Sequence, residues 1–259
     1  MESIKQHITS LEQKLLETFV CDGCHQHVSQ TELMIPFGPR AGERIIANYG
    51  CICDDIKLAE AAKQKHNQLK QSKLMDSFNY YSLTNRSLKE ATLENYDPTN
   101  NDLIKAKQSV AEYINAFEGE QNLLLTGAYG TGKSHLSVSI TKRLMESGYE
   151  CLFLSLPKLL TKIKRTYNTE GTTEDELLSV IQRVDLLVLD DIGAEQQTEW
   201  STSKLFEILD DRSGKATVYT TNLSSDELKE RVSERNFSRM MENTNVIVMN
   251  GSDYRRRAF

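Results

Sequence analysis

The chain contains, from Gly127 to Ser134, the sequence GAYGTGKS. It fits the pattern G-x-x-x-x-G-K-[ST], which forms a phosphate-binding loop between a β-strand and an α-helix. The loop follows the apolar run NLLLT at 122–126, typical of a short buried strand, and it opens an amphipathic stretch that predicts a helix as far as Ser147. Because strand, loop and helix occur in the required order, the motif predicts a site for nucleotide phosphates.

Each residue type in this loop suits a phosphate with its divalent cation. Glycines reach backbone conformations that other residues resist, so the loop can wrap its amides around an anion. Lys133 offers a positive charge to the β- and γ-phosphates, and Ser134 offers a hydroxyl to Mg²⁺. The residues of this segment that we expect to bind nucleotide are Gly127, Gly130, Thr131, Gly132, Lys133, Ser134 and His135.

A second apolar run, LLVLDD at 186–191, ends in two carboxylates. In open α/β sheets ligands bind beyond the carboxyl ends of the strands, so we expect both side chains near the loop. Asp190 is predicted to bind the nucleotide's Mg²⁺ together with Ser134, and Asp191 to act as general base toward an attacking water. Relatives of this motif often carry the longer Glu at the second place, so Glu195 is an alternative base.

Helix and strand patterns alternate from Asp102 to the C-terminus. Further strands are predicted at 151–155, 217–221 and 246–249, and helices at 104–117, 159–167, 174–183, 204–211 and 226–241. Apolar strands separated by helices indicate an α/β fold with a five-stranded parallel sheet covered on both faces.

A polar residue, Asn222, follows the strand predicted at 217–221. At the tip of a strand beside Asp190, its amide would reach the γ-phosphate or the attacking water. The alternative is that Asn222 caps the next helix, a position for which Ser225 and Asp226 are better placed.

Four of the five cysteines form a C-x2-C pair and a C-x-C pair in the first part of the chain. Four thiolates satisfy tetrahedral Zn²⁺, and a C-x2-C turn presents two ligands together. The C-x-C half is less usual, so His25 or His27 is an alternative ligand, and reduced structural cysteines are the alternative to a metal. The predicted zinc ligands are Cys21, Cys24, Cys51 and Cys53.

The chain divides into three zones by composition. Ile4, Ile8, Leu11 and Leu15 have the spacing of one helical stripe, and residues 56–73 also predict a helix. We expect a small zinc-binding α+β domain at 1–73, an irregular connector at 74–101, and the nucleotide-binding domain at 102–259.

The overall charge limits the choice of partners. The chain has 31 basic and 37 acidic residues in 259, for a net charge of −6, which excludes a chain-wide basic coat for nucleic acid but not a local groove. It has no secretory leader and no long apolar run, so we expect a soluble, cytoplasmic protein without a membrane contact.

Taken together, the motifs resemble those of AAA+ ATPases of the DnaC/DnaI helicase-loader type. The carriers of the resemblance are ATLENYDPTN at 91–100, GAYGTGKSH at 127–135, LLVLDDIGAE at 186–195, TTN at 220–222, ERVSERNFSRM at 230–240 and DYR at 253–255. It covers the chain from about Leu74 to the C-terminus, and the N-terminal cysteine segment resembles the zinc-bearing domain of DnaI-type loaders.

The resemblance implies roles that composition and spacing do not reveal. Asn222 would be the first sensor residue, Arg239 an arginine finger acting on a neighbour's nucleotide, and Arg255 the second sensor. The family's members bind the hexameric replicative helicase through the N-terminal domain, bind single-stranded DNA, self-associate through the ATPase domain and hydrolyse ATP. The alternatives are an IstB-type transposition helper ATPase and an adaptor that uses ATP only as a switch.

Overall fold

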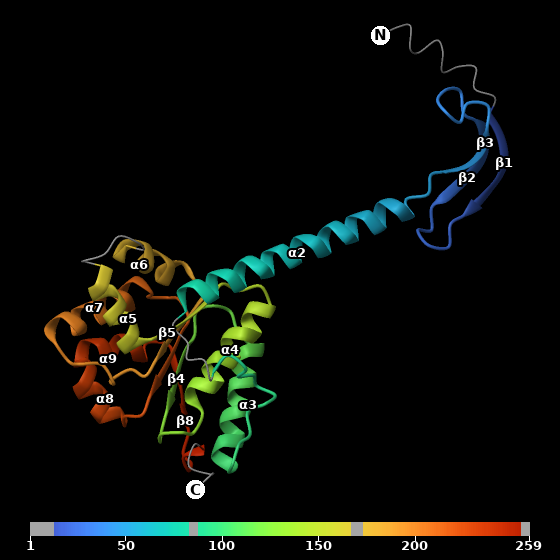
Figure 1. Ribbon diagram of the computed structural model, residues 1–259. Coiled ribbons are helices and arrows are strands. Elements are labelled where there is room, and N and C mark those ends of the chain that lie inside the picture. Colours follow the sequence, from blue (N-terminus) through green and yellow to red (C-terminus); the bar gives the residue numbers. More distant parts are fainter. Residues whose placement is uncertain (1–12, 83–87, 167–172, 255–259) are drawn as a thin grey trace. The chain divides into compact units, whose positions relative to one another are not determined.

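The computed structural model of the chain describes residues 13–82, 88–166 and 173–254 (Figure 1). The chain forms two compact units, Met1–Leu69 and Lys70–Phe259. The boundary between the units falls inside one helix, α2 (Cys53–Tyr81). None of the helices in the described ranges is long and apolar enough to cross a membrane.

The first unit is built on a three-stranded antiparallel sheet in the order β1-β2-β3. The strands are β1 (Gln13–Val20), β2 (His27–Met34) and β3 (Arg44–Tyr49). The helix predicted through Leu15 is wrong at that residue, because Leu15 lies in β1 and pairs with Thr31 of β2. Cross-strand pairing on both sides of an irregularity at Leu16 overrides the local helical spacing. Ile4, Ile8 and Leu11 lie outside the described residues.

Helix α2 is longer than the helix predicted at 56–73. It begins at Cys53 and ends at Tyr81, so the first part of the predicted irregular connector is helical. The physical reason is tertiary: Phe78 is buried in the core of the second unit, and Leu74 packs against the same cluster. Packing of two side chains onto a core stabilises a helical turn whose own sequence is rich in Ser, Asn and Tyr.

The second unit contains the five-stranded parallel sheet that the sequence predicts, in the order β5-β6-β7-β4-β8. The strands are β4 (Asn122–Thr126), β5 (Cys151–Ser155), β6 (Leu186–Asp190), β7 (Thr217–Thr221) and β8 (Thr244–Val248). Because all neighbours are parallel, the carboxyl ends of the strands share one edge, and β7 lies between the phosphate-loop strand β4 and the acidic strand β6.

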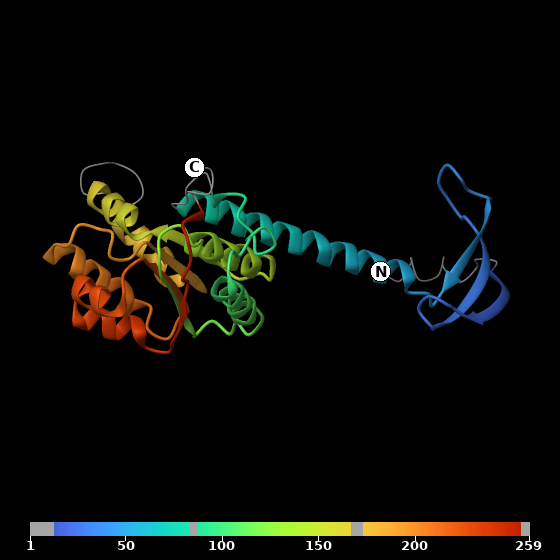
Figure 2. The ribbon, with the colours of Figure 1, turned by 90° about the horizontal axis from the view of Figure 1, so that it is seen from below.

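Helices cover both faces of this sheet (Figures 1 and 2). One face carries α3 (Asn101–Asn115) and α4 (Lys133–Glu146), and the other carries α5 (Leu156–Thr166), α6 (Glu174–Arg183), α7 (Glu199–Asp211), α8 (Ser225–Val232) and α9 (Glu234–Met241). Alternate residues of each strand enter opposite cores: Leu123 and Leu125 face α3 and α4, and Leu124 faces the other layer. Both faces are therefore apolar, as the continuous apolar strands require.

The single helix predicted at 226–241 is instead two helices, α8 and α9. Ser233 separates them with a φ of +82°, a left-handed conformation that ends α8. Its side chain then accepts a hydrogen bond from the Asn236 amide and caps α9. Asn236 is buried and donates to the Thr202 carbonyl of α7, so a tertiary contact stabilises the break. The break allows Val232 and Met240 to enter the same core.

Candidate functional site

The phosphate loop leaves β4 at the carboxyl edge of the sheet and ends at the first turn of α4. Gly132, with a φ of +90°, is the residue before the helix, so the loop ends at the amino-terminal end of α4, the end of a helix that favours an anion. The Lys133 side chain reaches back along the loop, and its Nζ lies 2.9 Å from the Gly127 oxygen and 2.6 Å from the Ala128 oxygen. Only 6% of Lys133 is exposed, so its charge lies in surroundings of low dielectric.

The candidate magnesium ligands meet beside the loop. Ser134 Oγ lies 2.8 Å and 3.0 Å from the two carboxylate oxygens of Asp190. Thr220 donates from Oγ1 to Asp190 Oδ1 at 2.7 Å. Thr220 belongs to β7, the strand between β4 and β6. Burial, and then the nearby Asp191 carboxylate, raise the pKa of Asp190 to about 6, so this carboxyl is mostly ionised at neutral pH. A hydroxyl beside an ionised carboxylate is a donor set that suits Mg²⁺.

The two candidate bases occupy different surroundings. Asp191 has a φ of +59°, unusual for a residue other than glycine, and its amide donates to Thr220 Oγ1 at 2.9 Å. Glu195 is 8% exposed, and its Oε2 accepts a hydrogen bond from the Gly193 amide at 2.9 Å. Arg231 donates to the carbonyl oxygens of Gly193 and Glu195. The Glu195 carboxylate is thus engaged within its own loop, whereas Asp191 adjoins Asp190.

Asn222 follows β7 at the same edge of the sheet, where the sequence places it. It does not cap the next helix: the cap of α8 is Ser224, which accepts from the Glu227 amide, and neither Ser225 nor Asp226 has that role. The adjacent Leu223 carbonyl accepts a hydrogen bond from Thr126 Oγ1, 2.9 Å away at the end of β4. This contact ties the segment around Asn222 to the strand that precedes the phosphate loop.

The two predicted arginines are placed differently. Arg239 lies on α9 with 41% of its side chain exposed, and its Nη2 is 2.8 Å from Asp210 Oδ1. None of its described contacts involves the phosphate loop of its own chain. Arg255 lies outside the described residues. The residue before it is Tyr254, whose amide donates to the Gly130 oxygen at 3.1 Å. The chain therefore contacts the phosphate loop at the position that precedes Arg255.

His135, which the sequence places with the nucleotide-binding residues, faces the segment before the core. Its Nε2 lies 2.9 Å from the Thr92 oxygen, and its ring centre is 5.5 Å from that of Tyr96. Thr131 is buried and donates from Oγ1 to the Ala128 oxygen, which closes the loop on itself. In this structure His135 therefore joins α4 to residues 92–96.

Sequence reasoning missed three residues that build this site. Thr220 stands within the TTN motif, yet only the pairing of β6 with β7 shows that its hydroxyl serves Asp190 and Asp191. Arg231 is one of several arginines near the C-terminus, and no local pattern separates it from the others. Tyr96 stands within ATLENYDPTN, one of the runs that carry the family resemblance, yet this segment is predicted to be irregular and no local pattern identifies Tyr96 as a contact of the loop.

The four cysteines of the first unit come together. Their sulfur atoms all lie within 4.8 Å of one another, with Cys21 3.5 Å from Cys53 and 3.8 Å from Cys51. A tetrahedral Zn²⁺ with bonds of about 2.3 Å to sulfur separates its sulfur ligands by about 3.8 Å, so the group fits this ion. Neither His25 nor His27 belongs to the group.

Local backbone geometry favours the thiolate of Cys24, whereas the side chains of Cys21, Cys51 and Cys24 raise the pKa of Cys53 to about 12. Hydrogen bonds from the backbone at Ile52 and Gln26 lower the pKa of Cys24 to about 6. Gly23 stands inside the C-x2-C turn, where an added Cβ would lie 2.9 Å from Cys53 Sγ, so a larger residue would crowd the sulfur. Four cysteine sulfurs would occupy all four positions of a tetrahedral ion, which is the feature of a closed structural site.

Comparisons with known proteins agree with this architecture. The family model for the IstB-like ATP binding protein matches residues 57–258. The replicative helicase loader DnaC of Escherichia coli K12 is 29% identical over 170 residues, which cover 64% of this chain and 69% of the relative. The loader DnaI of Bacillus subtilis is 23% identical over 232 residues, covering 87% of this chain and 71% of the relative.

Solved structures show the same fold. The crystal structure of a DnaC helicase loader superposes with a TM-score of 0.59 and 26% identity, covering 64% of this chain and 99% of that one. The crystal structure of DnaI superposes with a TM-score of 0.56 at 23% identity, over 66% of this chain and 94% of that one.

Proposed function

Because the chain belongs to the IstB-like ATP-binding protein family, we propose that it is an ATPase that loads a replicative DNA helicase onto single-stranded DNA. One observation carries the proposal. The similarity to the Bacillus subtilis helicase loader covers 87% of this chain, more than the whole second unit, so it extends into the cysteine-bearing unit. The similarity to a protein named as a loader is therefore not confined to the nucleotide-binding unit.

In this proposal the site at the sheet edge hydrolyses ATP. Lys133 and the amides of the loop bind the phosphates, and Ser134 with Asp190 binds Mg²⁺, which neutralises charge on the β- and γ-phosphates when bound. Asp191 orients and deprotonates the attacking water, and Asn222 contacts the γ-phosphate or that water. Arg239 acts on the nucleotide of a neighbouring copy, which makes self-association part of the cycle, and Arg255 acts within its own chain.

The first unit is the proposed docking site for the hexameric helicase. Its strands expose large apolar side chains, including Leu15 and Ile46, which is 62% exposed, and the hairpin loop exposes Phe37. Exposed apolar side chains gathered on so small a sheet are typical of a protein-binding surface. In this proposal Zn²⁺ holds the sheet in shape, and the sheet contacts the helicase.

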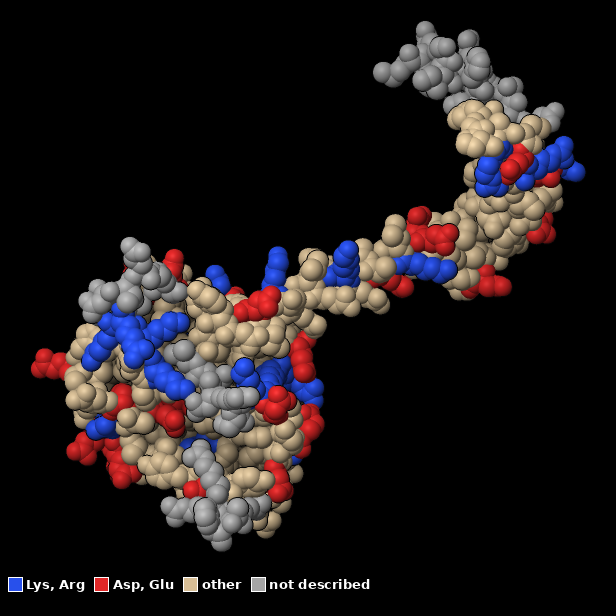
Figure 3. Space-filling model, in the orientation of Figure 1, with Lys and Arg blue, Asp and Glu red and all other residues tan. Residues whose placement is uncertain are grey.

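Single-stranded DNA is proposed to contact the basic face of α5. Lys158, Lys162 and Arg165 line an open hollow of about 600 Å³ together with Pro157 and Thr161, without an acidic side chain. Figure 3 shows basic side chains gathered over this part of the second unit. Because α5 directly follows β5, it starts at the carboxyl ends of the strands, where the phosphate loop also lies. A local basic surface of this kind reconciles nucleic-acid binding with a net charge of −6.

Removal of these three charges is expected to weaken DNA binding and its salt dependence. A variant with Lys158, Lys162 and Arg165 all changed to Ala releases fewer counterions, so the log–log slope of affinity against salt should fall by about 2 for single strands. Fluorescence anisotropy with a labelled oligothymidine across a salt series measures both quantities. The matched control changes Lys57, Lys63 and Lys65 on α2, which removes the same charge from the other basic helix. Loss of binding in the control alone would place the DNA on α2.

The loader proposal is tested by binding and by turnover. The full chain with ATP should form a complex with the purified hexameric helicase of its own organism, and Ile46→Lys should weaken that complex without changing ATP affinity. Turnover should require ATP, Mg²⁺ and DNA or helicase. Absence of any complex would exclude a loader, and duplex-DNA-dependent action with a transposase would indicate the helper ATPase instead. A complex that cycles normally when Asp191 is changed to Asn would indicate a non-hydrolytic adaptor.

A further inference from the structure

Two consecutive carbonyl groups of the phosphate loop are held by donors from distant parts of the chain. The Tyr96 hydroxyl donates to the Thr131 oxygen at 2.7 Å. The Tyr254 amide donates to the Gly130 oxygen at 3.1 Å. One donor precedes the core and the other follows the last strand, so neither belongs to the strand–loop–helix unit that defines the motif.

These two bonds determine the direction of two loop amides. In a planar trans peptide the C=O and N–H groups point in opposite directions, and none of the peptide bonds here is cis. Holding the Gly130 carbonyl therefore orients the Thr131 amide, and holding the Thr131 carbonyl orients the Gly132 amide, in both cases away from the external donor. In the described part of the chain, the Gly132 amide has no hydrogen-bond acceptor, and the Thr131 amide closes a turn that begins at Ala128. Successive amides in such a loop form an anion-binding concavity.

The two external segments also contact the loop closely. A Cβ at Gly132 would overlap the Tyr96 ring, and a Cβ at Gly130 would overlap Asp253, the neighbour of Tyr254. Both glycines have positive φ, +90° and +73°. The donors therefore reach the carbonyls only because glycine leaves room at these positions, and the loop is enclosed from two sides.

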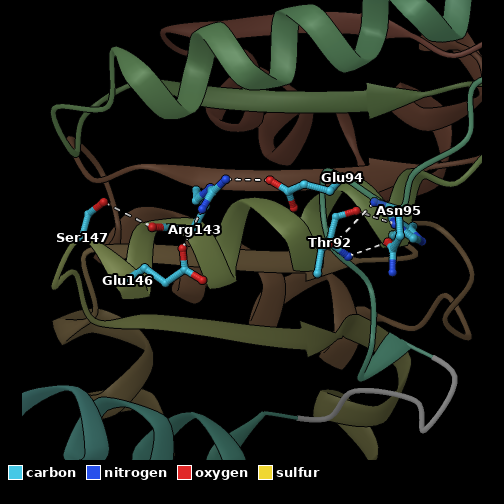
Figure 4. A network of polar contacts seen from close by, with 7 residues as sticks. Thr92, Glu94, Asn95, Arg143, Glu146 and Ser147 are labelled. Atoms are coloured by element: carbon cyan, nitrogen blue, oxygen red, sulfur yellow. Dashed lines mark hydrogen bonds and ion pairs between the residues drawn. The ribbon is translucent and has the colours of Figure 1, made fainter. Parts of the chain in front are cut away.

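Tyr96 is itself firmly placed. It is 6% exposed, and Lys107 of α3 donates to its carbonyl at 2.9 Å. The turn just before it is closed by hydrogen bonds between Thr92 and Asn95 and anchored to α4 by the Glu94–Arg143 ion pair at 2.6 Å (Figure 4). Burial raises the pKa of Tyr96 to about 12, so its hydroxyl remains a donor throughout the neutral range.

The segments that carry the two donors are joined to each other. Asn100 caps α3 through its side-chain oxygen and donates from Nδ2 to the Asn250 carbonyl at 2.9 Å. The Met249 amide donates to the Thr126 oxygen at 2.7 Å, just before the loop. The segment before α3 and the segment after β8, which carry the two donors, are therefore hydrogen-bonded to each other and to the end of β4.

We propose that the Tyr96 hydroxyl and the Tyr254 amide are positioning groups that aim the amides of Gly132 and Thr131 at the β-phosphate of a bound nucleoside di- or triphosphate. The amides are oriented before the ligand arrives, so binding does not have to order them. This inference rests on the ATP binding within the proposed function, and not on the helicase or DNA partners.

The Tyr96→Phe variant isolates the hydroxyl while keeping the ring against Gly132. A hydrogen bond of this kind contributes about 0.5–1.5 kcal/mol, so ADP affinity should fall by about 2- to 12-fold. ADP and pyrophosphate should lose affinity by the same factor, whereas adenosine should not, because it lacks the β-phosphate. With ATP, KM should rise with little change in kcat. Equal ADP affinity in wild type and Tyr96→Phe, or equal losses for ADP and adenosine, would overturn the role.

The Tyr254 amide is tested by a matched pair of variants. Tyr254→Ala keeps the amide, and Tyr254→Pro removes it. We expect Tyr254→Pro to bind ADP about 2- to 12-fold more weakly than Tyr254→Ala by isothermal titration calorimetry of the full chain. Equal affinities of the two variants would overturn the role of this amide. Failure of the wild type itself to bind ADP would overturn the proposed ATPase as well, so the two failures are distinguishable.

Discussion

Changing Lys133 to Ala is expected to reduce kcat/KM for ATP hydrolysis by at least about 10²-fold. Removal of one preorganised group that stabilises charge in a transition state costs about 10²–10³ in rate. Lys133 is 6% exposed, and its Nζ lies at the mouth of the loop beside the oxygens of Gly127 and Ala128. A full charge in such shielded surroundings acts more strongly on phosphate than one in water.

Steady-state phosphate release with helicase and single-stranded DNA present measures this effect. The matched control is Lys105→Ala, which removes an exposed lysine of α3 and should leave turnover within about twofold, as expected of a surface change. If the Lys133 variant kept more than a tenth of wild-type turnover, the phosphate site would have been assigned to the wrong residues.

Removal of the metal is expected to unfold the first unit and leave the second intact. Among the described residues of the first unit, Val28 is the one large apolar side chain that is buried. So small a core cannot offset the entropy of ordering the sheet, whereas structural Zn²⁺ contributes about 10–16 kcal/mol to such folds at neutral pH. The four thiolates hold together the β1–β2 turn, the segment after β3 and the start of α2.

Chelation followed by metal analysis and amide NMR measures this loss. One equivalent of zinc should be released, the dispersed signals of β1–β3 should collapse, and ADP binding by the second unit should persist. Cys21→Ser should reproduce this state, whereas Cys151→Ala, which changes a buried cysteine of β5 outside the group, should retain the metal. A Cys21→Ser protein with a full equivalent of zinc and an intact sheet would contradict a structural metal site.

Local patterns predicted the strands of the second unit closely, because each is a short run rich in apolar or β-branched residues between helices. They were less reliable where a tertiary contact decides the backbone. Asn236 binding to α7 accompanies the break between α8 and α9, and Phe78 entering the core extends α2. Leu15 shows the same effect in the first unit, where pairing with Thr31 makes a strand from a stretch with helical spacing.

The sequence by itself determined the phosphate loop, the acidic strand end and the cysteine set, because each is a local pattern in which residue type and spacing carry the chemistry. Only the tertiary structure decided how these parts are held. The order of the strands places Thr220 of β7 beside Asp190 of β6, where its hydroxyl and that of Ser134 both contact the same carboxylate. Tyr96 and Tyr254 both contact the loop, although Tyr96 precedes the first strand of the domain in the sequence and Tyr254 follows the last. Such contacts join residues far apart in the chain, and no periodicity or spacing records which distant groups the packed fold brings together.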